Sequence, residues 1–121
     1  MVNFTSASAP MLDGRMPHIQ CTKDDISEIV LLPGDPGRVA LFEEFLQDFK
    51  IISRNREYTV GTGFYEGIKI TVCSTGIGAS STEIAVVQLI ALGAKALIRI
   101  GGTGVIREDI PCGTMVLNTA A

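Results

Sequence analysis

The sequence contains no tryptophan and only one histidine, and it has no excess of basic residues. Lysine and arginine total 10 against 13 acidic residues, which gives a formal net charge of −3. A protein that binds nucleic acid or anionic membrane surfaces through general electrostatics needs a basic face. The charge balance therefore excludes nucleic acid and membrane as general partners, and any bound anion must be held by a few placed residues.

Long hydrophobic runs and paired cysteines are also missing. No segment reaches the roughly 18 consecutive apolar residues of a membrane span, and the N-terminus lacks the apolar run of a signal peptide. The cysteines, Cys21, Cys73 and Cys112, form no Cys-x-x-Cys pair, so they predict reduced thiols rather than a metal site. These absences predict a cytoplasmic protein.

The length and the hydrophobic content of the chain predict one domain or part of one. The chain has 121 residues, of which 46% are hydrophobic, and this supports a sizeable core. Residues 1–17 show neither helical nor strand periodicity and contain two prolines, which predicts a flexible N-terminal arm. Residues 18–121 are expected to form the α/β part.

Apolar runs of strand length alternate with helical patterns along residues 18–121. The expected strands are 29–32, a pair within 49–60, 68–74, 94–100 and 112–119, the expected helices are 36–48 and 80–92, and Thr22 caps a short turn. In helix 80–92, Ile84, Val87, Ile90 and Ala91 form the expected core face. This order predicts an α/β fold with a mixed, mostly parallel sheet flanked by helices.

Residues 96–106 place one arginine in an apolar strand directly before a glycine-rich turn. Arg99 needs a partner if the strand is buried, because arginine is rarely buried unpaired. Gly101 and Gly102 then let the backbone approach a small ligand. The stretch indicates either an anion site at the mouth of a sheet or a solvent-facing arginine at a strand end.

Two further strand ends carry glycines before a helix. Gly34 lies in such a turn, with Arg38 in the first turn of the helix that follows, and residues 76–78 repeat the arrangement. Because the carboxyl ends of parallel strands share one edge, three such turns favour the anion site. His18, the only histidine, indicates by itself no more than a polar surface residue.

Four motifs resemble one known family. They are Ile-Val-Leu-Leu-Pro-Gly-Asp-Pro-Gly-Arg (29–38), Arg-Glu-Tyr-Thr (56–59), Val-Cys-Ser-Thr-Gly-Ile-Gly (72–78) and Leu-Ile-Arg-Ile-Gly-Gly-Thr-Gly (97–104). Together, and in this order, they resemble nucleoside phosphorylases of the uridine phosphorylase and hexameric purine nucleoside phosphorylase type. His18-Ile-Gln-Cys-Thr-Lys-Asp-Asp is most similar to the bacterial uridine phosphorylase branch. The resemblance implies conversion of a nucleoside and phosphate to a base and ribose 1-phosphate.

The resemblance also implies roles for individual residues. It assigns phosphate binding to Gly34, Arg38, Arg99 and a neighbour's Arg56, ribose binding to a neighbour's His18, and a potassium ion to Glu57, Ile77 and Ser81. Gly102 replaces the usual Thr or Ser of the family, and Thr103 is expected to compensate. No cofactor is required, the partners are phosphate and nucleoside, and the assembly is a homo-oligomer, either a dimer or a trimer of dimers.

Family members continue well beyond the position of Ala121. The part beyond supplies the base pocket and the segment that holds the ribose hydroxyls. We therefore expect a truncated product or fragment that carries a phosphate half-site and is inactive alone. The alternatives are a non-catalytic anion-binding or oligomerising remnant, and a purine nucleoside phosphorylase or nucleosidase relative. Arg38, Arg56 and Arg99 argue against the nucleosidase, which has no need of a phosphate site.

Overall fold

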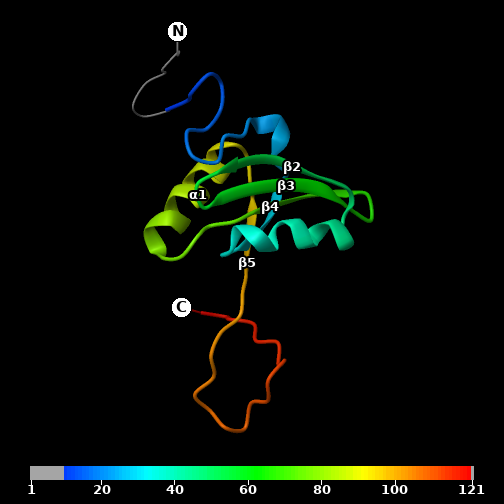
Figure 1. Cartoon of the computed structure of the whole chain (residues 1–121), viewed down its shortest axis with the longest axis vertical. Helices are drawn as coiled ribbons and strands as arrows, with labels where there is room; N and C mark the ends of the chain where they lie inside the picture. The colour runs from blue at the N-terminus through cyan, green and yellow to red at the C-terminus, as the bar shows by residue number, and fades with distance from the viewer. Residues whose placement is uncertain (1–9, 121) are drawn as a thin grey trace.

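A five-stranded sheet organises the computed structural model, which describes residues 10–120 (Figure 1). The strands are β1 (Ile29–Pro33), β2 (Gln47–Asn55), β3 (Tyr58–Tyr65), β4 (Ile68–Cys73) and β5 (Ala96–Ile100), in the spatial order β2-β3-β4-β1-β5. The α/β class and the mixed sheet are confirmed, but "mostly parallel" is wrong. Only the β1 pairings with β4 and β5 are parallel, because tight turns join β2 to β3 and β3 to β4 as antiparallel neighbours.

One α-helix and three short 3-10 helices accompany the sheet. They are α1 (Ala79–Ala91), η1 (Lys23–Asp25), η2 (Pro36–Arg38) and η3 (Ala40–Glu44). The predicted turn after Thr22 is present, with the Thr22 N–H and hydroxyl both donating to the Asp25 carboxylate at 2.8 Å, although the Thr22 side chain caps no backbone N–H. The single helix predicted over 36–48 is wrong: the segment forms two 3-10 turns, because the chain already enters β2 at Gln47.

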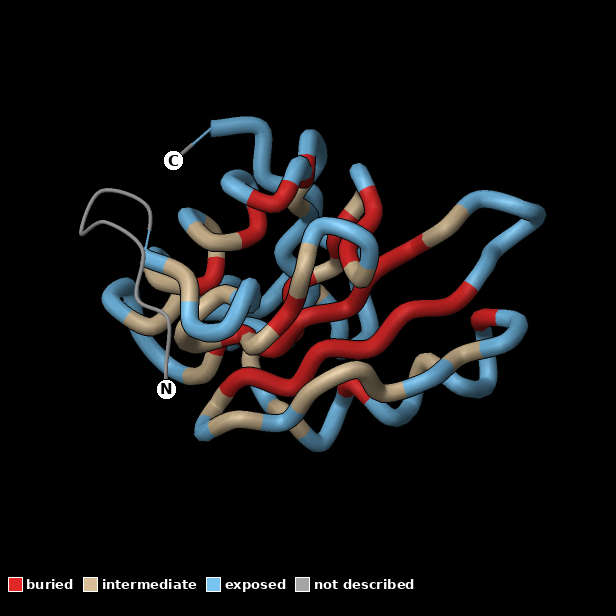
Figure 2. The backbone as a smooth tube through the Cα atoms, turned by 90° about the horizontal axis from the view of Figure 1, so that it is seen from above, coloured by how far each residue is buried: buried red, intermediate tan, exposed pale blue. Residues whose placement is uncertain are grey.

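The core consists of two clusters, one on each face of the sheet (Figure 2). β1 shows the division, because Val30 and Leu32 belong to the larger cluster while Ile29 and Leu31 pack against the smaller one. The larger cluster joins the sheet to α1 through Ala85 and Leu89, and the smaller cluster lies beside η3 and includes Val39, Leu46, Ile70 and Val72. Both faces of β1 are thus covered, and its carboxyl end is held firmly.

Helix α1 packs through a different face from the predicted one. Ala85 and Leu89 are fully buried, whereas Val87 and Ile90 are 58% and 55% exposed. The apolar residues of this helix extend around more than one side, so periodicity alone does not select the buried side. Packing against Ile19, which is also fully buried, fixes the orientation.

The segment before the sheet is partly ordered against this core. Leu12 and Arg15 form an isolated bridge, and Met16 packs on the larger cluster. Residues 1–9, most of the predicted arm, lie outside the described residues. The arm therefore stays a prediction.

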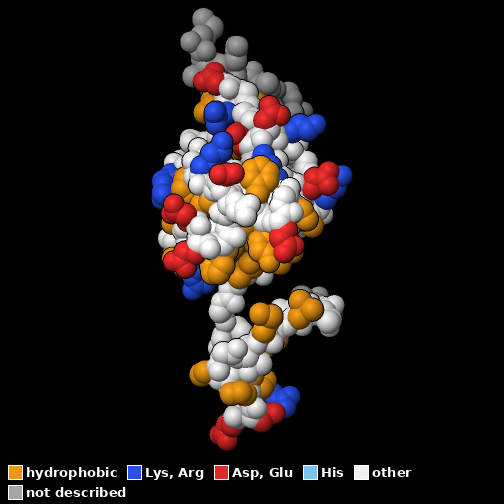
Figure 3. Space-filling view, turned by 90° about the vertical axis from the view of Figure 1, so that its right-hand side faces the viewer, with side chains coloured by type: hydrophobic (Ala, Val, Ile, Leu, Met, Phe, Trp, Pro, Cys, Tyr) orange, Lys and Arg blue, Asp and Glu red, His pale blue; other side chains and the backbone are white. Residues whose placement is uncertain are grey.

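Residues 101–120 leave the end of β5 and extend away from the sheet without a helix or strand (Figure 1). The strand predicted at 112–119 is not formed, because a strand needs a neighbour to pair with and this segment has none. Met115 and Leu117 are 95% and 86% exposed. Figure 3 shows hydrophobic side chains along this segment and on the lower part of the domain beside it.

None of the helices within residues 10–120 is long and apolar enough to cross a membrane.

The three free thiols differ in their surroundings, which predicts a difference in reactivity. Burial raises the pKa of Cys73 to about 12 and raises that of Cys21, while Cys112 is exposed. Because the thiolate is the nucleophile, one thiol is expected to react quickly with a disulfide reagent at mildly alkaline pH, and all three after denaturation. Cys112→Ser is the control and is expected to abolish the fast reaction. A second fast thiol in this variant contradicts the burial of Cys21 and Cys73.

Candidate active site

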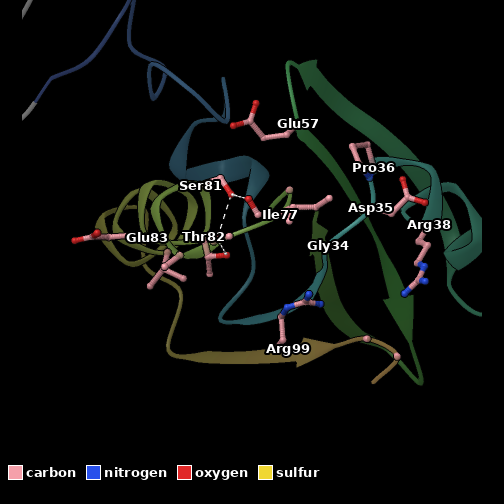
Figure 4. A pocket seen from close by; sticks show the side chains of 16 residues that line it. Gly34, Asp35, Pro36, Arg38, Glu57, Ile77, Ser81, Thr82, Glu83 and Arg99 are labelled. Atoms are coloured by element: carbon pink, nitrogen blue, oxygen red, sulfur yellow. Dashed lines mark hydrogen bonds between the residues drawn. The ribbon is translucent and has the colours of Figure 1, made fainter. Parts of the chain in front are cut away.

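A pocket of about 1120 Å³ opens at the edge of the sheet where β1, β4 and β5 end (Figure 4). The start of β3 lies at the same edge, because Val60 pairs antiparallel with Cys73 at the end of β4. The lining therefore comes from loops that are distant in sequence: Gly34, Asp35, Pro36, Arg38, Glu57, Gly76, Ile77, Gly78, Ala79, Ser81, Thr82, Glu83, Val86, Arg99, Gly101 and Gly102.

The loops after β1 and β4 are joined by backbone hydrogen bonds. The Thr75 N–H donates to the Pro33 carbonyl at 3.0 Å, and the Gly76 N–H donates to the Gly34 carbonyl at 2.9 Å. Gly76 has φ of 70°, and a Cβ there would lie 2.9 Å from the Cβ of Glu57. Glycine is thus required at this position on both conformational and steric grounds. The floor of the pocket is consequently a fixed pair of loops.

Arg99 extends from β5 across the Gly34 loop. Its Nη1 donates to the carbonyls of Leu32 at 3.0 Å and Ile100 at 2.7 Å, and a Cβ on Gly34 would lie 3.0 Å from Nη2. Of the two interpretations that the sequence left open for this strand, burial does not apply, since β5 is an edge strand and Arg99 is exposed. The two carbonyls nevertheless hold the guanidinium in one orientation, with Nη2 beside Gly34.

Arg38 lies on the other side of Gly34 from Arg99 (Figure 4). It ends η2, a turn that starts where the Asp35 carboxylate accepts a hydrogen bond from the Gly37 N–H at 2.8 Å. Within residues 10–120 Arg38 forms no salt bridge. Its guanidinium is therefore available to an anion in the pocket, although Asp35, Glu57 and Glu83 also line the site and limit its positive charge.

The start of α1 adds a third source of positive potential. Gly78, with φ of 105°, precedes the helix, and Ala79, Ser81 and Thr82 of its first turn line the pocket. The first N–H groups of a helix have no partner within the helix and carry a partial positive charge. Two guanidiniums and a helix start thus surround one space, which is the arrangement an oxyanion needs.

The residues expected to hold a cation lie around Gly76, on the same pocket. Ser81 Oγ is 3.3 Å from the carbonyls of Ile77 and Gly78, to which it donates, and Gly76 separates it from Glu57. Carboxylate, hydroxyl and carbonyl oxygens are the donors that hard cations prefer. Within residues 10–120, no group of three His, Cys, Asp or Glu side chains could hold a metal ion. The donors that the proposed cation site offers are the oxygens of Glu57, Ile77 and Ser81.

Tyr58 stabilises this region from below. Its hydroxyl donates to the Ser81 carbonyl at 3.0 Å. Burial raises the pKa of Tyr58, and the nearby Glu57 carboxylate raises it further, so the phenol keeps the proton that it donates. The first turn of α1 is consequently tied to the start of β3.

Three of the predicted site residues do not line the pocket. Arg56 is exposed in the turn between β2 and β3, next to Glu57. Thr103 lies on the segment after β5, and its hydroxyl donates to the Gly104 carbonyl at 3.2 Å. His18 lies beside the middle of α1. The pocket does bring together the other predicted site residues, which are Gly34, Arg38, Arg99, Glu57, Ile77 and Ser81.

The sequence model of the phosphorylase superfamily matches residues 28–121. The chain belongs to this superfamily. The match begins just before β1 and includes every strand and loop that builds the pocket.

Individual members of the phosphorylase superfamily are similar over most of this chain. A uridine phosphorylase of Thermococcus kodakarensis is 43% identical over 98% of this chain and 43% of its own length. A guanosine phosphorylase of Halorubrum lacusprofundi is 38% identical over 88% of this chain and 44% of its own. The crystal structure of uridine phosphorylase from Vibrio fischeri superposes with a TM-score of 0.79 at 40% identity, covering 81% of this chain and 41% of that one. The predicted family is confirmed, and the chain spans less than half the length of these relatives.

Sequence reasoning missed a buried serine that shapes the site of this superfamily member. The Ser74 hydroxyl accepts a hydrogen bond from the Thr59 N–H at 2.7 Å and donates to the Glu57 carbonyl at 2.6 Å. It therefore fixes the turn that carries Arg56 and Glu57 against the loop after β4. The available signal was a pair of hydroxyl residues, Ser74 and Thr75, directly after an apolar strand and before a glycine.

Proposed function

We propose that this chain provides the phosphate half-site of a uridine-phosphorylase-like nucleoside phosphorylase. The observation that supports it most is the convergence of Arg99, Arg38 and the Gly34 loop with the start of α1 on one pocket. Superfamily membership and the similarity to uridine phosphorylases point to the same chemistry. The reaction converts a nucleoside and phosphate to a base and ribose 1-phosphate.

In the proposed mechanism the chain binds and aims the nucleophile. A phosphate oxygen forms a bond to C1′ of the nucleoside as the bond from C1′ to the base nitrogen breaks, and the electron pair leaves with the base. The guanidiniums of Arg99 and Arg38 orient the phosphate through charge-assisted hydrogen bonds in fixed directions. Phosphate held against C1′ also stabilises the positive charge that develops on that carbon in the transition state.

Residues outside this pocket are proposed to act in the site of a second copy. In that second site, Arg56 binds phosphate and His18 binds the ribose. In the same proposal a potassium ion is held by the oxygens of Glu57, Ile77 and Ser81, where it neutralises the carboxylate between copies. The assembly is a homo-oligomer built on such dimers.

Gly102 is proposed to weaken phosphate binding at this site, because it lacks a hydroxyl group. A side chain at this position would meet nothing within 4 Å, so the place of the family's hydroxyl is open. One missing hydrogen bond to a charged group weakens binding by about 1.5–3 kcal/mol. Thr103 lies outside the pocket lining, and we propose that it approaches the phosphate only when residues 101–104 close over the site.

The proposal is tested by measuring thermal unfolding of this chain with and without phosphate. Phosphate binds only the folded pocket, so a concentration about 100 times the Kd is expected to stabilise the chain by about 2.7 kcal/mol. Sodium chloride at matched ionic strength is the control and is expected to give little protection. Under the proposal of a phosphate half-site alone, uracil release from uridine by this chain is expected to be undetectable.

Other results assign the chain differently. Equal protection by chloride and phosphate leaves an oligomerising remnant without a phosphate site. Robust release of uracil overturns the claim that the chain is inactive alone. Phosphate-dependent cleavage of guanosine instead of uridine favours the purine alternative, which the similarity to a guanosine phosphorylase supports.

A further inference from the structure

His18 is held by three elements, although it lies outside the pocket. From α1, the Gln88 side-chain oxygen accepts from the backbone N–H groups of His18 and Ile19 at 3.2 Å each, and Gln88 Nε2 lies 2.6 Å from His18 Nδ1. At the end of β2, the Asn55 amide donates to the His18 carbonyl at 2.7 Å. The Tyr58 ring meets the imidazole edge-on, with the centroids 6.3 Å apart. The backbone and the ring of His18 are therefore fixed together.

These contacts determine which way the Gln88 amide faces. A backbone N–H can only donate, so the Gln88 atom that meets two of them must be the oxygen. The amide nitrogen then faces the imidazole, and an amide NH₂ can only donate as well. Nδ1 of His18 is consequently the acceptor and carries no proton. In the neutral ring the proton is on Nε2.

We propose that Gln88 is a positioning residue, which selects the His18 tautomer with the proton on Nε2. The backbone N–H, the carbonyl and Nδ1 of His18 all have partners, so Nε2 is its remaining polar atom with none within residues 10–120. An Nε2–H is a donor and selects an oxygen acceptor. The ligand class is a sugar hydroxyl, and this assignment of the ligand rests on the proposed function.

The position of Gln88 on the helix indicates where that donor acts. Gln88 follows the first residue of α1, Ala79, by nine positions. At 1.5 Å per residue this is about 14 Å along the axis from the helix start at the pocket. The Nε2–H therefore lies well away from the helix start, and under the proposed function it serves a nucleoside on a second copy, while α1 supports the phosphate pocket of its own chain.

The tautomer is measured directly by long-range proton–nitrogen NMR of the ¹⁵N-labelled chain at alkaline pH. His18 is the only histidine, so its two ring nitrogens give the only imidazole signals. We expect an unprotonated Nδ1 and a protonated Nε2. In Gln88→Glu the carboxylate cannot donate, so the proton is expected to move to Nδ1. In Gln88→Met, which removes both hydrogen-bonding groups without adding charge, the signals are expected to average between tautomers.

Gln47→Glu is the matched control, because it makes the same change at an exposed position at the start of β2 and is expected to leave the tautomer unchanged. A protonated Nδ1 or averaged signals in the parent chain overturn the proposal, and so does a Gln88→Met spectrum identical to the parent. The measurement needs neither phosphate nor nucleoside. Its failure is thus distinguishable from failure of the proposed function, which shows as absent phosphate protection.

Discussion

Arg99→Ala is expected to remove about half or more of the protection that phosphate gives this chain against thermal unfolding. The guanidinium is held beside Gly34 by the carbonyls of Leu32 and Ile100, so it meets the anion without first being ordered. Losing a hydrogen bond between charged groups costs about 1.5–3 kcal/mol, which weakens phosphate binding roughly 10- to 150-fold. Isothermal titration calorimetry with phosphate measures the change in Kd.

Arg107→Ala is the control for Arg99→Ala. Arg107 is exposed on the segment after β5 and pairs with Asp109 at 2.6 Å, so its removal makes the same change in net charge away from the pocket. Its phosphate Kd is expected to match that of the parent. Equal loss of affinity in both variants would mean that net charge, not the placed guanidinium, governs binding, and would contradict the assignment of Arg99.

Leu89→Ala is expected to destabilise the chain by about 2–5 kcal/mol, the usual cost of truncating a buried leucine. Leu89 is fully buried in the cluster that joins α1 to the sheet. A loss of this size is a large fraction of the free energy of unfolding of a small domain, so the variant is expected to be partly unfolded at 37 °C. Urea unfolding followed by circular dichroism measures it.

Ile90→Ala makes a similar truncation one residue further along α1 and serves as the comparison. Ile90 is 55% exposed, so its truncation is expected to cost well under half as much as that of Leu89. Equal destabilisation of the two variants, or a larger loss in Ile90→Ala, would contradict the packing of α1 through Ala85 and Leu89.

Strands β1, β4 and β5 were predictable because each is a largely apolar run that a glycine follows within a few residues, at Gly34, Gly76 and Gly101. The buried face of α1 could not be predicted, because its hydrophobic residues lie on more than one side of the helix. Packing against Ile19 and the sheet determines which side is buried. The absence of a strand at 112–119 could not be predicted either, since a strand depends on a neighbour that the local sequence does not specify.

The candidate site likewise has residues that the sequence predicts and hydrogen-bond partners that it does not. Gly34, Arg38 and Arg99 follow from glycine-rich turns at parallel strand ends, which topology brings to one edge. Their partners do not follow, because the hydrogen bonds from Arg99 to Leu32 and from Gln88 to His18 join residues 67 and 70 positions apart. Such long-range contacts leave no periodic trace in the sequence, so only the folded chain identifies the groups that orient the functional side chains.

The position of β5 at the border of the sheet has a practical consequence for handling the protein. On the side away from β1, its backbone N–H and C=O groups have no strand to pair with in the described part of the chain, and Ile98 and Ile100 beside them are 50% and 42% exposed. Such a border is a template for β-sheet aggregation. We therefore expect concentrated stocks of this chain to precipitate slowly through pairing of this border.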